Sequence, residues 1–534
     1  MHQFPWLSVL IALPVLGAFG VALLPKGSDE LAKISALVVS SVVAVLTLAM
    51  TTQFATNGPA NGHRFQLEEK YDWISQFGVH WGLGVDGLSL VLILLSVILV
   101  PVVILASWHD ADRSGGAAEV APKRSVKTYF ALLLILEAMM IGVFAATDVF
   151  LFYVFFEAML IPVYFIIGSF GGLQRSYAAV KFLLYSLFGG LLMLVAVIWL
   201  YVLSAQQNLG GKTGKPGEHI ASFMFGDLIK ANIDPTTAKW LFLGFFIAFA
   251  IKAPMVPFHT WLPDAAGQAP AGAAVLIVGV LDKVGTYGML RFCLELFPGA
   301  AKWATPVVIT LAVVGIIYGA VLAIGQVDLK RLIAYTSISH FGFIILGVFA
   351  MTSQGQSGAT LYMVNHGFST AALFLVAGFM ISRRGSARID AYGGVQKVAP
   401  LLAGTFLVAG LSGLSLPGLS SFVSEFLVLV GTFTRYRVPA VIATLGMILA
   451  AVYILWMYQR TMNGPTAERV KGMKDLSWRE LVVVAPVIAI IVALGFFPKP
   501  VLDVINPSVS KTLERVQMQD PNPTVKLAEK GVRP

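Results

Sequence analysis

The sequence predicts an all-α membrane protein with about fourteen transmembrane helices, and three observations lead to that prediction. Hydrophobic residues make up 57% of the 534 residues and charged residues 12%, whereas a soluble domain carries about 25% charged residues. Apolar runs of about 20 residues, the length that spans a bilayer, recur from end to end. The basic residues behind the net charge of +9 lie mainly in short connections between those runs, which favours a membrane protein over a nucleic-acid-binding one.

The expected spans follow the apolar runs in order. Residues 5–24 lack a basic n-region and a small-residue cleavage site, so this run is expected to be a retained helix rather than a signal peptide. The next six spans are expected at 31–52, 85–107, 126–146, 148–169, 177–205 and 238–258. The last seven are expected at 270–297, 303–325, 331–352, 358–382, 398–432, 439–461 and 479–497. Two of these, 270–297 and 398–432, are too long for simple straight spans.

The connections between the spans predict the orientation of the chain. Odd-numbered connections hold most of the lysines and arginines, such as Lys123 and Arg124, and even-numbered ones hold far fewer. The positive-inside rule therefore places the odd-numbered connections in the cytoplasm and both termini outside. The tail after about Asn506 is polar, contains Pro521 and Pro523, and is expected to be loosely ordered or to lie on a partner.

Two spans contain prolines that predict a break in the helix. In IKAPMVPFHTWLPD, residues 251–264, Pro254 and Pro257 each remove a backbone donor and free a carbonyl one turn back. In GLSGLSLPGLSSFVSEF, residues 410–426, Pro417 does the same among small residues. Irregular backbone at membrane depth is tolerated only where protein buries it or where it lines a wet cavity, so both breaks point to a functional interior.

These breaks fall in the seventh and twelfth spans, five spans apart. Broken helices at matching positions of two halves are typical of transporters built from inverted repeats. The spacing favours two inverted five-helix repeats, spans four to eight and spans nine to thirteen. The expected divisions are residues 1–107 for the first three helices, 126–297 and 303–461 for the two repeats, and 479–534 for the last helix and the polar tail.

Ionisable residues stand inside the apolar spans, where an ionised side chain costs roughly 2.5–3.5 kcal/mol even on the mildest insertion scales. Across both repeats they are Glu137, Glu157, Lys252, Lys283, His340, His366 and Glu425. Removal from water lowers the pKa of a lysine and raises that of a glutamate, and proximity couples their protonation. Lysine, imidazole and water held by free backbone carbonyls can pass protons along such a series. The pattern therefore predicts a proton relay.

Each of these residues also has a structural interpretation, which the sequence leaves open. A Glu157–Lys252 pair can serve as a staple within a helix bundle, and either central histidine alone can be a packing residue. Glu137 can act as a helix–helix hydrogen-bonding group, Lys181 can extend to the lipid headgroups, and His259 can cap a broken helix. The set as a whole favours the relay, because a structural explanation has to account for several insertion costs separately.

Other chemistries find no support in the sequence. GLGVDG, residues 82–87, matches the dinucleotide-binding pattern G-x-G-x-x-G, but it leads directly into an apolar span with no βαβ unit around it. A Walker motif and a nucleophile elbow are absent, and the single cysteine, Cys293, excludes an internal disulfide and a thiolate-held cluster. No cofactor or metal is therefore expected in this chain.

Six stretches together resemble one known family. They are GVDGLSL (84–90), FFEAMLIPVYFIIG (155–168), AVKFLLYSLFG (179–189), IKAPMVPFHTWLPDA (251–265), DLKRLIAYTSISHFGFIILG (328–347) and LSLPGLSSFVSEFLVL (414–429). These look like the antiporter-like subunits of respiratory complex I, the NADH-quinone oxidoreductase, over nearly the whole transmembrane part. The resemblance implies a multi-pass, proton-pumping subunit of the bacterial cytoplasmic membrane that transfers no electrons itself.

The same resemblance implies a role for each ionisable residue. Glu157 matches the family's glutamate of the fifth helix, which pairs with Lys252 of the broken seventh, and Lys283 matches the lysine that links the half-channels. The remaining matches are the central histidines, the terminal acid and a fourth-helix carboxylate, in this chain His340, His366, Glu425 and Glu137. L- and N-type members typically carry lysine in place of the terminal acid.

The chain departs from the family in two places. The family's LPDAHxEAP reads LPDAAGQAP here, with Ala266 and Gln268 in place of a histidine and a glutamate, so the roles of those two side chains do not carry over. Asp282 is an unusual residue before Lys283. It points about 100° away from Lys283 around the helix, so it is no obvious partner of that lysine.

The resemblance also implies partners. These are L- and N-type membrane neighbours and, through the complex, a peripheral redox arm, with FMN, iron–sulfur clusters and quinone expected in the partner subunits. Two alternatives stay open: a subunit of a multi-subunit Na⁺/H⁺ antiporter, which shares much of the motif, and a passive scaffold whose buried charges only lock helices together. A carrier for sugars or amino acids is disfavoured, because these motifs contain no recognition pocket.

Overall fold

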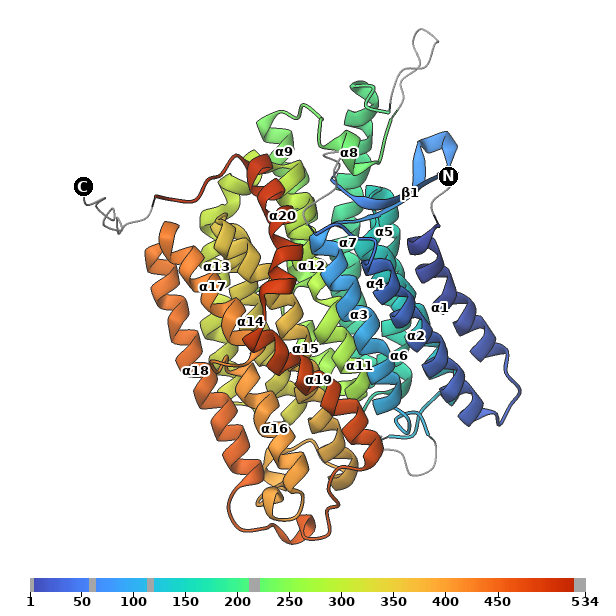
Figure 1. Ribbon diagram of the computed structural model, residues 1–534, viewed down its shortest axis with the longest axis vertical. Helices are drawn as coiled ribbons and strands as arrows, with labels where there is room; N and C mark the ends of the chain where they lie inside the picture. The colour runs from blue at the N-terminus through green and yellow to red at the C-terminus, as the bar shows by residue number, and fades with distance from the viewer. Residues whose placement is uncertain (1–3, 57–63, 113–119, 211–220, 523–534) are drawn as a thin grey trace, which may run out of the picture.

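The computed structural model describes residues 4–56, 64–112, 120–210 and 221–522, and it confirms the predicted all-α membrane fold. Twelve helices within these ranges are long and apolar enough to cross a bilayer, and they match twelve of the fourteen expected spans. The two others are the broken seventh and twelfth. The helices run side by side as one bundle, in which α1 (Trp6–Leu23) begins and α20 (Lys499–Val516) ends toward the same end (Figure 1).

The helices of the first half lie close to the expected limits. They are α2 (Asp29–Thr51), α3 (Gly87–Ala106), α4 (Val126–Ala145), α5 (Val149–Ala158), α6 (Leu160–Phe170), α7 (Arg175–Gln206), α8 (Phe225–Leu228), α9 (Pro235–Lys252) and α10 (Trp261–Gln268). Aspartate caps start three of them: Asp86, Asp148 and Asp234 accept hydrogen bonds from first-turn backbone N–H groups of α3, α5 and α9. α5 and α6 form one span that is interrupted at Met159, beside Pro162.

The helices from the eighth span onward complete the bundle. They are α11 (Ala271–Leu276), α12 (Lys283–Gly288), α13 (Pro298–Ile324), α14 (Leu329–Ala350), α15 (Ser353–Arg384), α16 (Pro400–Gly413), α17 (Ser420–Arg435), α18 (Arg437–Met462) and α19 (Trp478–Phe496). Short 3-10 helices occupy Ser75–Phe77, Ile389–Ala391, Val395–Lys397 and Glu468–Val470. The eighth span, Ala271–Leu294, joins α11 and α12 to two π-helical stretches, Ile277–Leu281 and Met289–Leu294.

Two spans stop inside the bundle. α9 ends at Lys252 and α10 begins at Trp261, with Pro254 and Pro257 between them. α16 ends at Gly413 and α17 begins at Ser420, with Pro417 between them. In both places the chain leaves helical geometry at membrane depth, where protein buries the exposed backbone.

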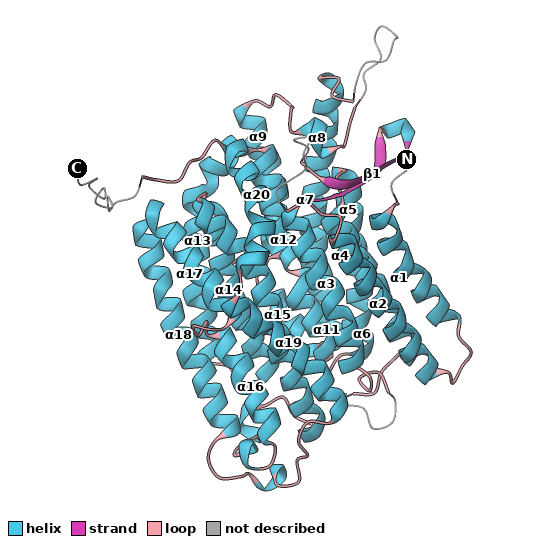
Figure 2. Cartoon of the chain, viewed as in Figure 1, coloured by secondary structure: helices cyan, strands magenta, loops and turns pink. Residues whose placement is uncertain are grey.

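A β-hairpin precedes α3 and lies outside the apolar spans, at the end of the bundle that also carries α8 (Figure 2). Strands β1 (Gln66–Ile74) and β2 (Val79–Val85) pair antiparallel, with Glu69 opposite Leu83. The glycine-rich stretch 82–87 forms the end of β2 and the start of α3, where Asp86 and Ser89 make a reciprocal capping box. The stretch that matches G-x-G-x-x-G therefore ends in the cap of α3 in this fold.

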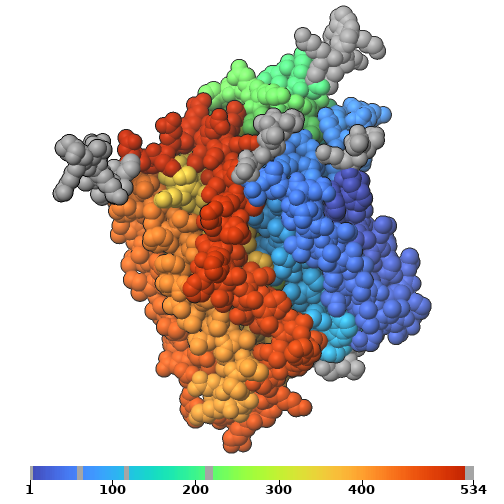
Figure 3. Space-filling model, in the orientation of Figure 1, coloured from blue at the N-terminus to red at the C-terminus, as the bar shows by residue number. Residues whose placement is uncertain are grey.

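The prediction of a loosely ordered tail from Asn506 is wrong up to Val516. α20 is a regular helix that packs on this same chain: Ser508 accepts a hydrogen bond from the backbone of Gly87, and Asn506 accepts one from Ser357. The prediction failed because the apolar face of α20 is too short for a span but sufficient for a surface helix. Figure 3 shows the red C-terminal segment lying across the boundary between the earlier and later parts of the chain. Pro523 and the residues after it lie outside the described ranges.

Candidate functional site

The ionisable residues singled out from the sequence face the interior of the bundle. Glu137, Lys252 and Lys283 are fully buried, and His340, His366 and Glu425 are at most 5% exposed. Glu157 is half-buried. Direct contacts join Lys283, His366 and His340, whereas Glu157 and Lys252 share no hydrogen bond or ion pair among the described residues.

Lys283 and His366 are in direct contact at the centre of the molecule. Lys283 Nζ lies 2.7 Å from His366 Nδ1 and donates to the backbone carbonyl of Val278 at 2.6 Å. The π-helical turn directs the N–H of Asp282 to Ile277, five residues back, instead of to Val278. Such single π turns often occur at functional sites. Here the turn supplies the acceptor that holds the lysine against the imidazole.

From His366 the contacts continue through aromatic rings to Glu425. The His366 and His340 ring centroids are 5.3 Å apart, and His340 Nε2 lies 3.4 Å from the hydroxyl of Tyr453. The ring of His340 also packs on Tyr362 at 5.8 Å. Tyr362 in turn donates a hydrogen bond of 2.7 Å to Glu425. This set, the central polar chain, is Lys283, His366, His340, Tyr362, Tyr453 and Glu425.

The broken twelfth span positions the acid at the end of the central polar chain. Glu425 lies in the second turn of α17, and Ser415, in the break before that helix, donates a hydrogen bond of 2.5 Å to the same carboxylate oxygen as Tyr362. Ser415 has a left-handed backbone (φ +61°), which turns its hydroxyl back over the carboxylate. The break therefore fixes Glu425 from two directions.

In the first repeat, Glu157 and Lys252 interact electrostatically but do not form a direct ion pair. Within the described part of the chain, Lys252 Nζ has no hydrogen-bond partner and lies 4.7 Å from the ring centroid of Phe156. The Glu157 carboxylate occupies space beside Gly190 of α7, where a Cβ atom would overlap it. The pairing implied by family resemblance therefore stays a prediction, because the two charges influence each other but no hydrogen bond or ion pair joins them among the described residues.

The other three residues considered from the sequence lie apart from the central polar chain. Both carboxylate oxygens of Glu137 lack hydrogen-bond partners among the residues the structure describes. Lys181 forms an ion pair of 2.7 Å with Asp264, which also pairs with Arg331 at 2.6 Å. His259 packs its ring edge-on against Tyr318 at 5.1 Å. Lys181 thus joins α7 to the segment after the break, a structural role.

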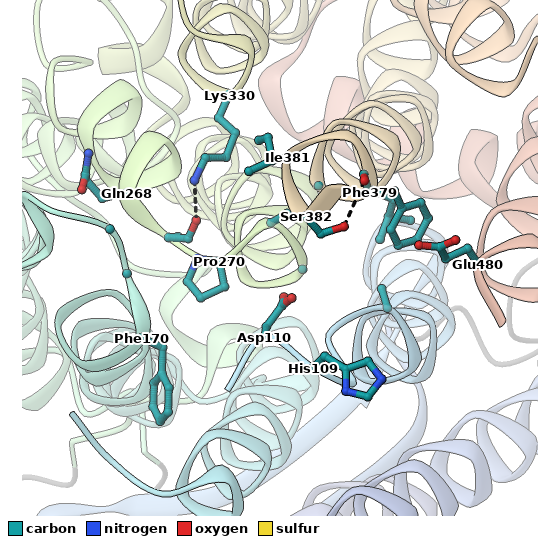
Figure 4. Close-up of a pocket in the computed structure, with 18 of the residues that line it drawn as sticks. His109, Asp110, Phe170, Gln268, Pro270, Lys330, Phe379, Ile381, Ser382 and Glu480 are labelled. Carbon is teal, nitrogen blue, oxygen red and sulfur yellow. Dashed lines mark hydrogen bonds between the residues drawn. The ribbon is translucent and has the colours of Figure 1, made fainter. Parts of the chain in front are cut away.

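A cavity of about 230 Å³ opens near one end of the bundle. Every connection that lines it is odd-numbered in the predicted topology, through residues such as Asp110, Pro270, Lys330 and Arg479. His109 and Asp110 project toward it from one side and Lys330 from the other (Figure 4). Burial raises the pKa of Asp110, while Ser107, Arg479, Lys330 and His109 act in the opposite direction.

The cavity is connected to the central polar chain by two helices. Its lining includes Ala271 and Gly272 at the start of the eighth span and Gly378 of α15. Lys283 and His366 stand on these same two helices, about 18 Å further along each of them at 1.5 Å per residue. The eighth span and α15 thus both extend from the cavity to the Lys283–His366 contact.

Sequence reasoning missed two groups of residues. Tyr362 was overlooked although it stands one turn before His366 on the same helix face, an i, i+4 spacing that signals the contact. Arg291 was overlooked although it is a fully buried charge within the eighth span. It pairs with Asp86 at 2.6 Å and lies 3.7 Å from Glu295, which is also an ion-pair partner of Arg64.

Comparison with known proteins places this geometry in context. Residues 146–452 match a family described as NADH:quinone oxidoreductase/Mrp antiporter, transmembrane. A NADH-quinone oxidoreductase subunit M of Mycobacterium tuberculosis is 52% identical, over 98% of this chain and 97% of that protein. A chain of respiratory complex I from Thermus thermophilus has a TM-score of 0.82 and 31% identity, over 96% of this chain and 99% of its own length. A chain of the Mrp complex from a Dietzia species has a TM-score of 0.80 at 18% identity, over 96% of this chain and 100% of its own length, which shows a common fold.

Proposed function

The chain belongs to the NADH:quinone oxidoreductase/Mrp antiporter transmembrane family, and on this premise we propose that it is a proton-translocating membrane subunit of an NADH-quinone oxidoreductase. It is a multi-pass subunit of a multi-subunit membrane complex. The 52% identity to a subunit M over almost the full length favours this assignment over an Mrp antiporter subunit, for which the likeness is one of fold. Electron transfer, with FMN, iron–sulfur clusters and quinone, takes place in partner subunits.

The observation that carries the proposal is the line of hydrogen bonds and ring contacts in the central polar chain. Lys283 passes a proton to His366 across 2.7 Å, and the edge-to-face rings of His366 and His340 carry the path onward. The hydroxyl of Tyr453 meets His340 and that of Tyr362 meets Glu425, so two phenols lie between the imidazoles and the terminal acid. Amines, imidazoles, phenols and carboxylic acids can each both bind and release a proton, which is what relay chemistry requires. A change in the charge of Lys252 or Glu157 alters the proton affinity of the next member through the electrostatic coupling between them.

We place the uptake end of the relay at the cavity lined by Asp110 and Lys330. The odd-numbered connections around it are rich in basic residues, which assigns that end to the cytoplasm of a bacterial cell and both termini to the outer side. L- and N-type antiporter-like subunits are its expected membrane neighbours. Quinone chemistry elsewhere in the complex supplies the energy as a change in charge or conformation that reaches Lys252 and Glu157.

The assignment is tested in the assembled complex by Lys252→Met. The variant removes the charge and keeps most of the volume, so we expect normal assembly, depressed NADH:quinone turnover and fewer protons pumped per electron. Proton-to-electron stoichiometry equal to that of the unmodified complex would refute the relay. Identification of the co-purifying chains separates the two family branches, because flavin and iron–sulfur subunits belong to the oxidoreductase and small hydrophobic partners alone belong to the antiporter.

A further inference from the structure

One buried acid takes no part in the relay described so far. Asp282 is fully buried in the eighth span, and neither of its carboxylate oxygens has a hydrogen-bond partner within the described ranges. A carboxylate without partners in such surroundings costs several kcal/mol. The residue follows the π-helical turn directly and precedes Lys283, so the cost falls at the centre of the molecule.

The packing of the eighth span determines where Asp282 points. Gly285 stands three residues later, on the same helix face, and a Cβ atom there would lie 2.5 Å from the backbone nitrogen of Ala253 and from the carbonyl of Phe249. The face that carries Asp282 is therefore pressed against the last turn of α9. Lys252, which ends that turn, interacts electrostatically with Asp282.

Lys283 points the other way. Its amine contacts His366 of α15 and lies 5.1 Å from the ring centroid of Phe341 of α14. Two consecutive residues of one helix thus face the two halves of the molecule, Asp282 toward the broken seventh span and Lys283 toward the central polar chain. No direct contact joins Lys252 to Lys283 among the described residues. Asp282 is an acid that interacts with both lysines.

We propose that Asp282 carries the proton from Lys252 to Lys283. The Lys252 ammonium gives up a proton and becomes a neutral amine, and the Asp282 carboxylate takes it and becomes a carboxylic acid. The carboxylic acid then gives the proton to a neutral Lys283 amine, which becomes an ammonium, and the carboxylate is restored. One N–H bond breaks for each O–H bond formed, and the reverse in the second step, so no other reactant is needed. This inference rests on the proposed function.

The charges around Asp282 suit this role. Lys252 on α9 and Lys283 on its own helix are the cations that interact with it. Glu157 also interacts with Lys252, so the charge of Lys252 is coupled to two acids. When a proton passes from Lys252 to Asp282, Lys252 becomes a neutral amine and its charge interaction with Glu157 changes. This change in the Glu157–Lys252 pair gives the proton transfer its direction.

The test compares Asp282→Asn with two reference variants in the intact complex reconstituted into liposomes. Asparagine has the same shape but cannot take up a proton, so we expect an assembled complex whose proton pumping falls by about tenfold or more. Asp282→Glu retains an acid and is expected to pump at an intermediate rate. Thr286→Val, one turn further along the same helix, is the control for packing and is expected to pump normally.

The outcomes separate this inference from the function on which it rests. Normal pumping by Asp282→Asn together with impaired pumping by Lys252→Met overturns the role of Asp282 and leaves the relay intact. Normal pumping by both variants overturns the relay itself. Should Asp282→Asn fail to assemble, infrared difference spectra of the complex with ¹³C-labelled aspartate decide the question. A protonated-carboxyl band that responds to turnover and is lost in Asp282→Glu supports the inference, and the absence of such a band overturns it.

Discussion

Tyr362 donates a hydrogen bond of 2.7 Å to Glu425 from the helix face that also carries His366. The phenol therefore occupies the position between the central imidazoles and the terminal acid. Because Ser415 donates to the same carboxylate oxygen, two hydroxyls hold that oxygen. A carboxylate held in this way can accept a proton without a change in its position, which suits the last member of a relay.

Tyr362→Phe tests this relationship. The variant keeps the ring and its packing on His340 but removes the donor, so Glu425 loses one of two hydrogen bonds, at a cost of about 1–3 kcal/mol. We expect normal assembly with proton pumping reduced severalfold, measured in liposomes against NADH:quinone turnover.

Tyr458→Phe is the matched control for the loss of a phenol. Tyr458 donates its hydroxyl to the backbone carbonyl of Ala403 at 3.3 Å, away from the central polar chain. This variant is expected to pump normally. Equal pumping by the two variants would show that the hydroxyl of Tyr362 takes no part in proton transfer.

Gly190→Ala tests the position of Glu157. A Cβ atom at Gly190 would overlap the carboxylate of Glu157, so the acid must rotate away from its place beside α7. Helix propensity favours alanine over glycine by about 1 kcal/mol, so the helix itself is not weakened. We expect a stable subunit in which turnover and pumping both fall, because the charge interaction between Glu157 and Lys252 is disturbed.

The control for this substitution is Gly404→Ala on α16. Gly404 is exposed, and a Cβ atom there meets no other atom within 4 Å. The gain in helix propensity is the same, but no acid is displaced. Activity of Gly190→Ala equal to that of Gly404→Ala would contradict the view that the location of the Glu157 carboxylate matters.

Much of the architecture was predictable, because apolar runs and prolines act locally. Twelve of the spans appear as long helices at the expected places, and Pro254 and Pro417 lie in the two interruptions. The hairpin of β1 and β2 was not predicted, because it lies between spans and its sequence alternates only weakly. α20 was missed for a related reason. Its apolar face is buried only against the surface that α3 and α15 provide, and the sequence does not show that surface.

The sequence predicts which residues belong to the candidate site, but it does not predict which of them contact one another. Ionisable residues are easy to recognise within an apolar span, so six members of the relay could be named from the sequence. Which of them touch depends on helix rotation. The π-helical turn before Asp282 shifts the register of the eighth span, and this shift directs Asp282 and Lys283 to different halves. A regular helix built from the sequence gives the angle of about 100° between Asp282 and Lys283 around the helix axis. It does not show which residues each of the two side chains contacts.

Arg291→Met tests whether a buried charge can be structural in the same span that carries the relay. Arg291 pairs with Asp86 at the start of α3, and α20 is joined to the same cluster by the hydrogen bond from Thr512 to Glu295. Burial alone would raise the pKa of Asp86, yet Arg291 and Arg64 hold it at about 2. A pKa below the unfolded value contributes stability that is present above about pH 4 and is lost only as the pH falls toward 2.

Removal of Arg291 deprives the buried carboxylates of Asp86 and Glu295 of a cationic partner, and loss of one partner of a buried pair costs about 3–5 kcal/mol. We expect less assembled subunit and a lower unfolding temperature in detergent at neutral pH, with normal proton-to-electron stoichiometry in whatever complex assembles. Arg388→Met, which breaks the exposed Arg388–Asp390 pair, is the control and should change stability by less than about 1 kcal/mol. A stable Arg291→Met complex with impaired pumping would assign Arg291 to the relay instead, because a structural charge affects the amount of folded protein and a relay charge affects the protons moved by each molecule.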